Sequence, residues 1–576
     1  MRYTEEKNIL LLISLLKAHG IRKVIASPGS TNMSFVGSIQ QDDFFEIYSC
    51  VDERSAAYMA CGLAEESGQP VVISCTGATA SRNYPSALTE AYYRKLPVLA
   101  ITSTRNQGEM GQNIPQAIDR SIIQKDIAKK SIHVPTFVSS SDQSIYTTLI
   151  NDAILELNHN GKGPVHINLA TYYSEVYDVS ELPIVRKIER IKPNDTLPVL
   201  KSKRIGIFVG AHSKWSDIQT KAIDAFCEKF GAVVLCDRTS NYFGKHRILP
   251  TLAVTQRLYT SPCKSFDLLI HIGNISGSYF NFNVNEVWRI NPDGRVADTF
   301  RKLRYVFEYE EADFFNAYVN QFPNIESDFE EEWKNEISRI GSNIPELPFS
   351  HIWVAQQVLP KLPNESILHM GILSSLRSWN FFEPQNVVYG YCNTGGFGID
   401  GCVSTLLGAS LANPVQTYFG VVGDLAFFYD MNSLGNRHVG RNIRLIVVNN
   451  GRGQEFCNYA HAGSKFGGEE VKYIAAAGHF GKQSPDLLKH YSIDLGFEYL
   501  SASNKEEFLN CVDRFTSAES FEKPIVFEIF TNGDDESEAL KRMYNLEVDT
   551  KVAAKQAVKS ILGDSGLKKL KKIIKH

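Results

Sequence analysis

Residues 417–425 read Thr-Tyr-Phe-Gly-Val-Val-Gly-Asp-Leu, and residues 443–450 read Ile-Arg-Leu-Ile-Val-Val-Asn-Asn. Each segment is an apolar, β-rich run that ends in polar residues, and the spacing between the two runs fits one helix. Two strands joined by a single helical crossover run parallel, so their carboxyl ends lie at the same edge of the sheet. The pattern therefore predicts that Asp424 and Asn450 are neighbours in space.

Similar apolar runs recur along the whole chain with helix-length stretches between them. Continuous Val, Ile and Leu runs with this spacing are typical of parallel sheets that are covered by helices on both faces. The predicted class is therefore α/β, with three doubly wound parallel sheets. The other predicted strands lie at residues 23–27, 71–75, 98–102, 165–169, 204–210, 232–236, 267–273 and 525–530.

Two polar, proline-bearing stretches, residues 182–198 and 345–348, predict the domain boundaries. The expected domains are residues 1–185, 195–340 and 350–545, followed by a lysine-rich tail at residues 551–576. Apolar residues at helical spacing in that tail favour a solvated terminal helix over a segment that contacts an acidic partner or a membrane surface.

The overall charge is nearly balanced, with 60 Lys and Arg against 64 Asp and Glu, which disfavours binding to nucleic acid. No apolar run approaches the roughly 20 residues of a membrane-spanning helix. Glu5 and Glu6 precede the apolar run at residues 9–16, which favours an amphipathic helix over a signal peptide. The ten cysteines include no Cys-x-x-Cys pair, and we expect reduced core cysteines in a cytoplasmic protein.

The polar residues after the two quoted strands predict a site for a metal and a diphosphate. A carboxylate, an amide oxygen and a backbone carbonyl suit Mg²⁺ or Ca²⁺, whose shell is then completed by phosphate oxygens and water. Gly423 allows close backbone approach, and a helix is expected to begin at Asp430 with its N-terminus favouring the same anion. Asp or Asn alone often caps a turn after a strand, but both together favour the metal.

The motifs Gly423-Asp424-Leu425 and Val447-Val448-Asn449-Asn450, together with Gly398-Ile399-Asp400-Gly401, carry a resemblance to a known family. They resemble the diphosphate-binding signature of thiamine-diphosphate (ThDP) enzymes, and among these the menaquinone-pathway 2-succinyl-5-enolpyruvyl-6-hydroxy-3-cyclohexene-1-carboxylate synthases. The resemblance implies three domains of the ThDP-enzyme type. It also implies that Mg²⁺ is held by Asp424, Asn450 and the carbonyl of Arg452. The cofactor contacts that it implies are Gly398, the wedge Ile399, Gly423, Asp424, Leu425, Ala426, Asn450 and Phe456.

The N-terminal part matches the same family at Glu53 and in the small-residue loop that includes Thr76 and Gly77. The resemblance implies that Glu53 hydrogen-bonds the aminopyrimidine ring of ThDP and is the catalytic acid/base. From the residues alone, Asp52 and Glu53 also fit a simple cap for the helix that follows. The motifs in the C-terminal part favour the catalytic role.

The substrate residues implied by the resemblance are Ser30, Arg105, Gln116 and Arg377. The implied reaction is decarboxylation of 2-oxoglutarate followed by carboligation to isochorismate, in a homodimer or a dimer of dimers. The chain has Thr31 and Thr394 where the family has arginines, which favours the alternative of a related ThDP enzyme with another 2-oxoacid and acceptor. A third reading is a non-catalytic nucleotide-binding scaffold, against which the intact Glu53 stands.

Overall fold

The computed structural model describes residues 2–120, 122–278, 280–459, 461–479, 483–519, 522–550 and 552. The predicted tail at residues 551–576 therefore lies outside the described residues, apart from Val552. Contacts divide the chain into two compact units. The first runs to Thr196 and includes Asp293–Glu308, and the second holds Leu197–Pro292 and the residues from Tyr309 onward.

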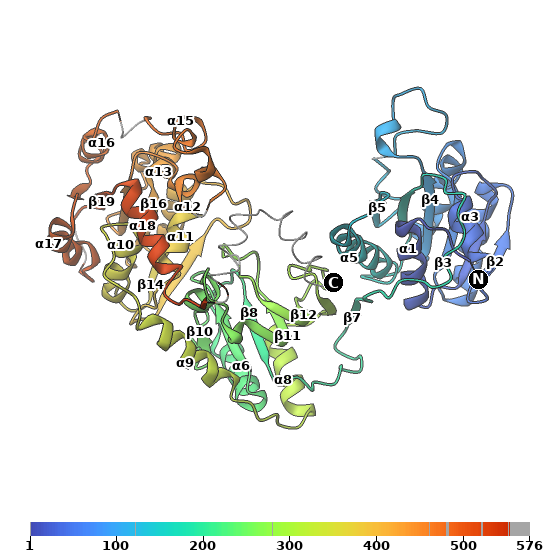
Figure 1. The fold of residues 1–576 in the computed structure, drawn as a ribbon, viewed down its shortest axis with the longest axis horizontal. Coiled ribbons are helices and arrows are strands. Elements are labelled where there is room, and N and C mark those ends of the chain that lie inside the picture. Colours follow the sequence, from blue (N-terminus) through green and yellow to red (C-terminus); the bar gives the residue numbers. More distant parts are fainter. Residues whose placement is uncertain are drawn as a thin grey trace. The chain divides into compact units, whose positions relative to one another are not determined.

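The first unit is built on a parallel sheet with the strand order β2-β1-β3-β4-β6-β5. Its strands are β1 (Lys23–Ala26), β2 (Glu46–Ser49), β3 (Val71–Thr76), β4 (Val98–Thr104), β5 (Lys130–Val134) and β6 (Val165–Ala170). Its main helices are α1 (Lys7–Ala18), α2 (Met33–Ile39), α3 (Glu53–Ser67), α4 (Pro85–Tyr93) and α5 (Ser140–Glu156). Figure 1 shows α1 and α3 on opposite sides of this sheet.

Alternate residues of each strand pack on opposite faces, as the period of two along a strand requires. Val24 and Val72 belong to the core beneath α1, α2 and α5. Their chain neighbours Ile25 and Ile73 belong to the core beneath α3 and α4. Both faces are thus buried, which explains why these strands read as continuous apolar runs.

The second unit holds two further parallel sheets. The strand order is β10-β9-β8-β11-β12 in one sheet and β15-β14-β16-β17-β19-β18 in the other. The first of these has β8 (Ile205–Val209), β9 (Val233–Cys236), β10 (Arg247–Ile248), β11 (Ser265–Ile272) and β12 (Asn283–Ile290). Its flanking helices are α6 (Asp217–Phe230), α7 (Thr251–Val254), α8 (Glu311–Gln321) and α9 (Phe329–Gly341).

The last sheet positions the metal and diphosphate motifs. Its strands are β14 (Ser366–Met370), β15 (Val388–Cys392), β16 (Tyr418–Gly423), β17 (Ile443–Asn449), β18 (Glu498–Ala502) and β19 (Ile525–Phe530). Its helices are α10 (His351–Val358), α11 (Ser374–Trp379), α12 (Cys402–Ser410), α13 (Asp424–Asp430), α14 (Gln454–Cys457), α15 (Glu470–Tyr473), α16 (Leu487–Asp494), α17 (Lys505–Thr516) and α18 (Gly533–Met543). Three parallel α/β sheets confirm the predicted fold class, and every predicted strand forms within a few residues of its expected ends.

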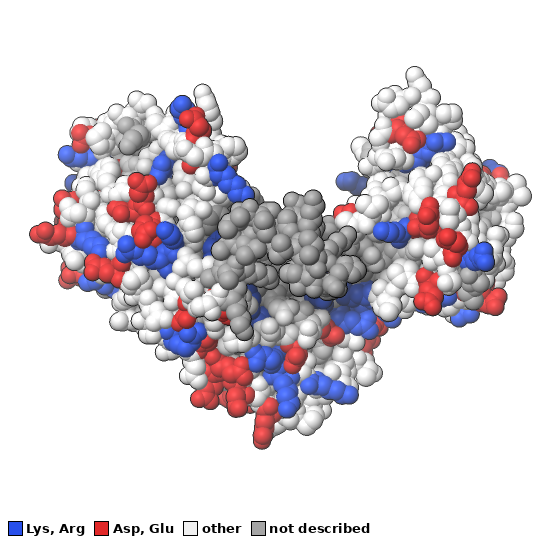
Figure 2. Space-filling model, in the orientation of Figure 1, with Lys and Arg blue, Asp and Glu red and all other residues white. Residues whose placement is uncertain are grey.

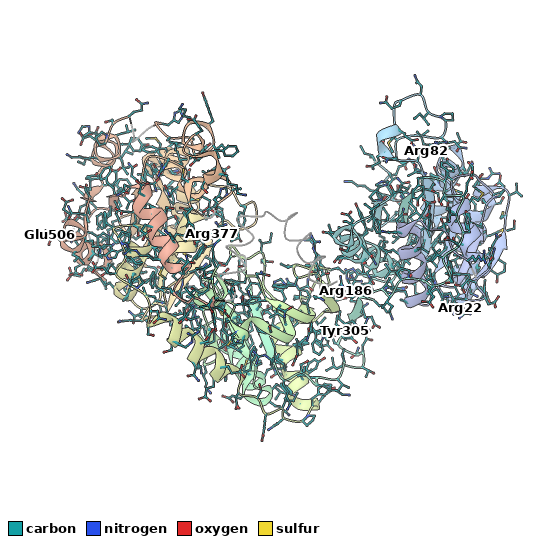
Figure 3. The ribbon with its side chains drawn as sticks, in the orientation of Figure 1. Arg22, Arg82, Arg186, Tyr305, Arg377 and Glu506 are labelled. Carbon is teal, nitrogen blue, oxygen red and sulfur yellow. The ribbon has the colours of Figure 1, made fainter. Side chains whose placement is uncertain are left out.

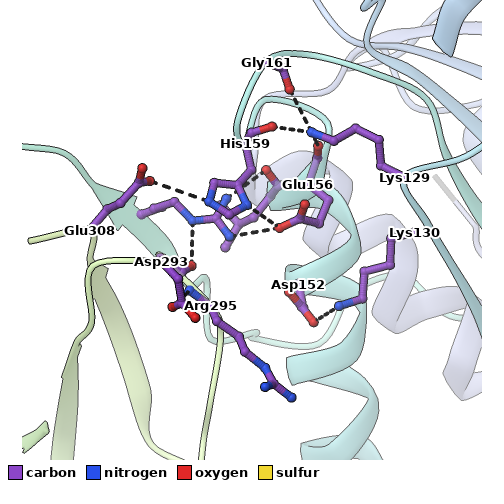
Figure 4. A network of polar contacts seen from close by, with 12 residues as sticks. Lys129, Lys130, Asp152, Glu156, His159, Gly161, Asp293, Arg295 and Glu308 are labelled. Atoms are coloured by element: carbon purple, nitrogen blue, oxygen red, sulfur yellow. Dashed lines mark hydrogen bonds and ion pairs between the residues drawn. The ribbon is translucent and has the colours of Figure 1, made fainter. Parts of the chain in front are cut away.

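Polar side chains join Asp293–Glu308 to the rest of the first unit. In this segment β13 (Leu303–Phe307) pairs in parallel with β7 (Glu189–Ile191). Figure 4 shows His159 between two carboxylates, with Nδ1 at 2.8 Å from Glu156 Oε1 and Nε2 at 3.7 Å from Glu308 Oε2. Arg190 donates to the carbonyl of Gly294 at 2.9 Å and pairs with Glu156 at 3.1 Å. These contacts explain why a segment distant in sequence folds with the N-terminal sheet.

The apolar run at residues 9–16 forms the middle of α1, so the predicted helix is confirmed. Every residue from Asn8 to Leu16 is buried, so the helix is enclosed on all sides rather than amphipathic. No helix among the described residues is both long and apolar enough to cross a membrane. All ten cysteines are free, and Cys75 and Cys236 are buried as predicted. On the face that Figure 2 shows, acidic and basic side chains are interspersed over the described residues.

Candidate functional site

The two quoted segments form adjacent parallel strands with their ends in register. Gly423, the last residue of β16, lies opposite Val448 of β17. Asp424 begins α13 directly after β16, and Asn450 directly follows β17. Both side chains line the same cavity at the carboxyl edge of this sheet, where open α/β sheets bind ligands.

The oxygen atoms at this edge fit a divalent cation. Asp424 is only 4% exposed, and burial raises the pKa of its carboxyl to about 7, although the backbone amides of Leu425 and Gly451 act in the opposite direction. The Oδ1 atom of Asn450 is buried and accepts no hydrogen bond from any described residue. A hard cation between these two groups would stabilise the carboxylate and give the amide oxygen a partner.

The cavity brings together most of the residues that the sequence predicts for the cofactor. It encloses about 100 Å³, and apolar side chains such as Leu425 and Phe456 form part of its wall. Gly398 is not among the described residues that line it, although its neighbour Ile399 is. The predicted residues in the lining are Ile399, Gly423, Asp424, Leu425, Ala426, Asn450, Arg452 and Phe456.

The side chain of Arg452 is taken up by other contacts. Its Nε donates to Gln454 Oε1 at 2.9 Å. Its guanidinium packs so closely on Gly533 that a Cβ there would lie 1.4 Å from Nη2, so a larger residue at position 533 would displace the Arg452 side chain. The role predicted for Arg452 therefore rests on its backbone carbonyl.

Only a short 3-10 helix, Met431–Gly435, begins after Asp430, and the helix that follows β16, α13, begins at Asp424 and ends at Asp430. Gly423 is extended, with ψ of 163°, and the helix follows it at once. Asp430 instead accepts hydrogen bonds from the amide of Ser404 at 2.6 Å and from the hydroxyl of Ser433 at 2.7 Å. It thereby ties the end of α13 to the first turn of α12.

In the first unit, the helix cap is made by Asp52 and does not involve the carboxyl group of Glu53. Asp52 is the N-cap of α3, and its carboxylate accepts from the amide of Ser55 at 2.7 Å. The half-buried Glu53 begins the helix, and its Oε2 accepts from Asn83 Nδ2 at 3.3 Å. Asp52 therefore satisfies the cap and leaves the carboxyl group of Glu53 available for another role.

Thr76 and Gly77 lie where β3 ends, at the carboxyl edge of the first sheet. Thr76 Oγ1 is buried and has no hydrogen-bond partner among the described residues. The amide of Gly77 donates to Thr31 Oγ1 at 3.3 Å, and Thr31 donates in turn to the carbonyl of Ser103 at 3.0 Å. A Cβ at position 77 would lie 2.2 Å from that carbonyl, so the turn requires glycine.

Three of the predicted substrate residues meet in the first unit through a tyrosine that sequence reasoning missed. Ser30 Oγ donates to Gln116 Oε1 at 3.1 Å, and Tyr173 Oη donates to the same oxygen at 3.4 Å. The guanidinium of Arg105 lies 4.7 Å from the centre of the Tyr173 ring. Tyr173 follows β6 by a few residues, so its place at a strand's carboxyl end was the available signal.

The fourth predicted substrate residue, Arg377, has an acidic neighbour. It lies on α11, where Figure 3 labels it, and its Nη1 forms a close ion pair with Glu455. Both line a second cavity of about 280 Å³ that also includes Arg257, His461 and Glu536. Burial raises the pKa of Glu536 to about 7. Thr394 is buried, with 6% exposure.

Comparison with known proteins identifies the family. Residues 10–123 match the N-terminal TPP-binding domain of thiamine pyrophosphate enzymes. A 2-succinyl-5-enolpyruvyl-6-hydroxy-3-cyclohexene-1-carboxylate synthase from Bacteroides thetaiotaomicron is 32% identical over 572 residues, covering 94% of this chain and 99% of the relative. Enzymes of the same name from Bacteroides fragilis and Phocaeicola vulgatus are each 30% identical, again covering 94% of this chain and 99% of each relative. The chain therefore belongs to the 2-succinyl-5-enolpyruvyl-6-hydroxy-3-cyclohexene-1-carboxylate synthase family of thiamine-diphosphate enzymes.

Proposed function

We propose that this enzyme uses ThDP and Mg²⁺ to decarboxylate 2-oxoglutarate and to join the remaining succinyl unit to isochorismate. The observation that carries the proposal is the pair of buried oxygens of Asp424 and Asn450 in one cavity with Ile399, Leu425 and Phe456. The product is the compound that the names of the relatives state. The ten free cysteines support work in the cytoplasm.

Magnesium would be held by Asp424, Asn450 and the carbonyl of Arg452, with diphosphate oxygens completing its shell. The buried carboxylate and the unpartnered amide oxygen support this set. Among the described residues, no group of three His, Cys, Asp or Glu side chains is placed to hold a metal ion. That finding favours an oxygen site with few protein ligands over a zinc-type site.

When bound, ThDP supplies the electron sink that lets a 2-oxoacid lose CO2 and lets the remaining acyl carbon attack an acceptor. Glu53 would hold and move a proton at the aminopyrimidine ring, with Asn83 fixing the direction of its carboxyl group. Ile399, which lines the cavity, would be the wedge against which ThDP packs. Leu425 and Phe456, whose side chains both lie beside Gly453, would exclude water from the reacting atoms.

The residues proposed to position the substrates are three in the first unit and one in the second. Ser30, Arg105 and Gln116 form one polar group at the carboxyl edge of the first sheet. Arg377 would hold the distal carboxylate of the donor, because a guanidinium binds a carboxylate through two parallel hydrogen bonds. Its pairing with Glu455 supplies a competing anion within the protein.

A homodimer or a dimer of dimers is part of the proposal. It is supported by the family, in which the pyrimidine-side and diphosphate-side domains that share a cofactor come from different subunits. Sedimentation of the holoenzyme is expected to give a dimer or a tetramer of the 64.5 kDa chain. A fully active species with the mass of one chain would contradict this part of the proposal.

The central test is CO2 release from a panel of 2-oxoacids by wild type and Glu53→Gln. We expect release with 2-oxoglutarate, and a loss of at least about 100-fold in the variant, because general acid/base groups contribute about 10²–10⁴-fold. ThDP binding should persist in the variant. Glu66→Gln, an exposed change on the same helix, is the matched control and should retain activity.

The outcome of that panel also decides between the two enzymatic readings. Thr31 and Thr394, together with the pairing of Arg377 with Glu455, favour a related enzyme with another 2-oxoacid and acceptor. Release with a different 2-oxoacid alone would keep the chemistry and replace the donor. Full activity of Glu53→Gln would contradict the proposed role of Glu53.

A second prediction concerns the ion pair at Arg377. Glu455→Gln removes an anion that competes with the donor, so the KM for 2-oxoglutarate should fall by about 3- to 10-fold, or about 0.7–1.4 kcal/mol. Arg377→Met should raise that KM by about tenfold or more, because a charge-assisted contact is lost. Glu506→Gln, an exposed change on α17 marked in Figure 3, is the control. An unchanged or higher KM in Glu455→Gln would show that Glu455 does not compete for the donor site.

A further inference from the structure

Arg120 is a buried cation in the first unit, and its neighbours accept only some of the hydrogen bonds that its guanidinium can donate. It is 6% exposed, and its Nη2 donates to Asn168 Oδ1 at 2.5 Å. Its Nε and Nη1 atoms are buried and have no hydrogen-bond partner among the described residues. Nor does Arg120 form an ion pair with any described carboxylate. A guanidinium in this state is costly to bury and is ready to receive an anion.

The groups around Arg120 do not neutralise it. Burial lowers the pKa of Arg120 to about 10, Cys75 acts in the opposite direction, and the nearby Arg82 lowers it further. His166 shares a small cavity with Arg120, and burial, with a contribution from Arg120, lowers the pKa of its imidazole to about 3. At neutral pH the cavity therefore contains a charged Arg120 beside a neutral His166. Arg82 lies at the same cavity and donates to the carbonyl of Asp119 at 2.9 Å.

Arg120 also lies at the edge of the sheet where the other candidate ligand groups converge. A Cβ on Gly77 would lie 2.4 Å from its Nη2 and 2.6 Å from its Nη1. The amide of Gly77 donates to Thr31, and Thr31 donates to the carbonyl of Ser103. Ser30 precedes Thr31, and Arg105 follows the end of β4 that contains Ser103. The guanidinium of Arg120 thus packs on Gly77, and Gly77 in turn contacts the turn that carries Ser30 and the strand end that precedes Arg105.

We propose that Arg120 is a specificity-determining residue that binds a carboxylate group of a substrate at the carboxyl edge of the first sheet. The inference rests on the proposed function and deepens it by naming a protein cation for one of its anionic groups. A guanidinium presents a fork of donors that matches a carboxylate, and its unpartnered Nε and Nη1 can serve as such donors. Arg120 supplies a cation against Gly77, whose amide contacts Thr31, a position at which this chain has no arginine.

Both the donor 2-oxoacid and the acceptor carry carboxylates, so the experiment separates the two. With the Mg²⁺- and ThDP-loaded enzyme, the KM for 2-oxoglutarate is measured from CO2 release and the KM for isochorismate from product formation. Binding of isochorismate without the donor is measured by calorimetry. The variants are Arg120→Gln and Arg120→Lys, and the control is Arg94→Gln, an exposed arginine at the end of α4.

We expect Arg120→Gln to raise one of the two KM values by about tenfold or more, with kcat changed far less. Arg120→Lys should recover part of the loss, because it keeps the charge and loses the fork. The melting temperature of Arg120→Gln should not fall, because removal of a buried, unpaired charge offsets the lost contact with Asn168. A rise in the isochorismate KM with weaker calorimetric binding identifies the acceptor carboxylate, and a rise in the 2-oxoglutarate KM identifies the donor.

Unchanged KM values for both substrates in Arg120→Gln would overturn the inference. A lower melting temperature with equal losses in both kinetic constants, not rescued by lysine, would also overturn it, since that result marks a structural residue. Failure of the proposed function is seen separately, in the wild type. If the wild type releases CO2 only from another 2-oxoacid, the proposed donor is replaced, and the same two KM values measured with that donor decide the role of Arg120.

Discussion

The structure of the site depends on the parallel pairing of β16 and β17. Because the two strands are joined through one helical crossover, they place Asp424 and Asn450 at one edge of the sheet. At this edge, burial makes the carboxyl group of Asp424 costly to ionise. The amide oxygen of Asn450 is buried there and has no hydrogen-bond partner among the described residues. A divalent cation with a diphosphate resolves both conditions at once. The cofactor proposal follows from this local arrangement, and full-length similarity to one enzyme family supports it independently.

The sequence predicts the central strands well because their signal is local. Strands buried on both faces must be apolar throughout, so β16, β17 and β19 stand out as continuous runs. Among the strands that the sequence did not predict, β14 and β15 contain His369 and two tyrosines among their apolar residues, which hides the pattern. The helix start at Asp430 was misplaced because an Asp reads as a cap wherever it precedes a helix-like stretch. Its carboxylate instead caps a different helix, α12, through Ser404.

Contacts between distant segments account for what the sequence could not predict at the site. Tyr173 joins Gln116 and Arg105 only because the loop after β6 returns to the carboxyl edge of the sheet. The pairing of Glu455 with Arg377 joins α14 to α11, and no spacing rule relates the two positions. The division of roles between Asp52 and Glu53 likewise required the position of Asn83. The residue types indicate the chemistry of the site, but only the tertiary structure shows which charged side chains are free to bind a ligand and which are paired within the protein.

Those charges are distributed differently in the two units. Arg377 has an acidic partner within the protein, whereas Arg120 is buried with part of its guanidinium unpaired. A paired guanidinium can bind a substrate only if its partner carboxylate moves away. An unpaired buried guanidinium is stabilised when an anion binds to it. Substrate selection in this enzyme is therefore expected to depend on the balance between internal and ligand carboxylates.

The most direct test of the central claim is a calorimetric titration of ThDP into the cofactor-free protein, with and without Mg²⁺, for wild type, Asp424→Asn and the exposed control Asp494→Asn. We expect wild type and the control to bind ThDP tightly only with Mg²⁺. We expect Asp424→Asn to weaken this binding by at least about tenfold, or 1.4 kcal/mol. Binding of ThDP by Asp424→Asn as tight as that of wild type, or wild-type binding that is independent of Mg²⁺, would contradict a magnesium site at Asp424.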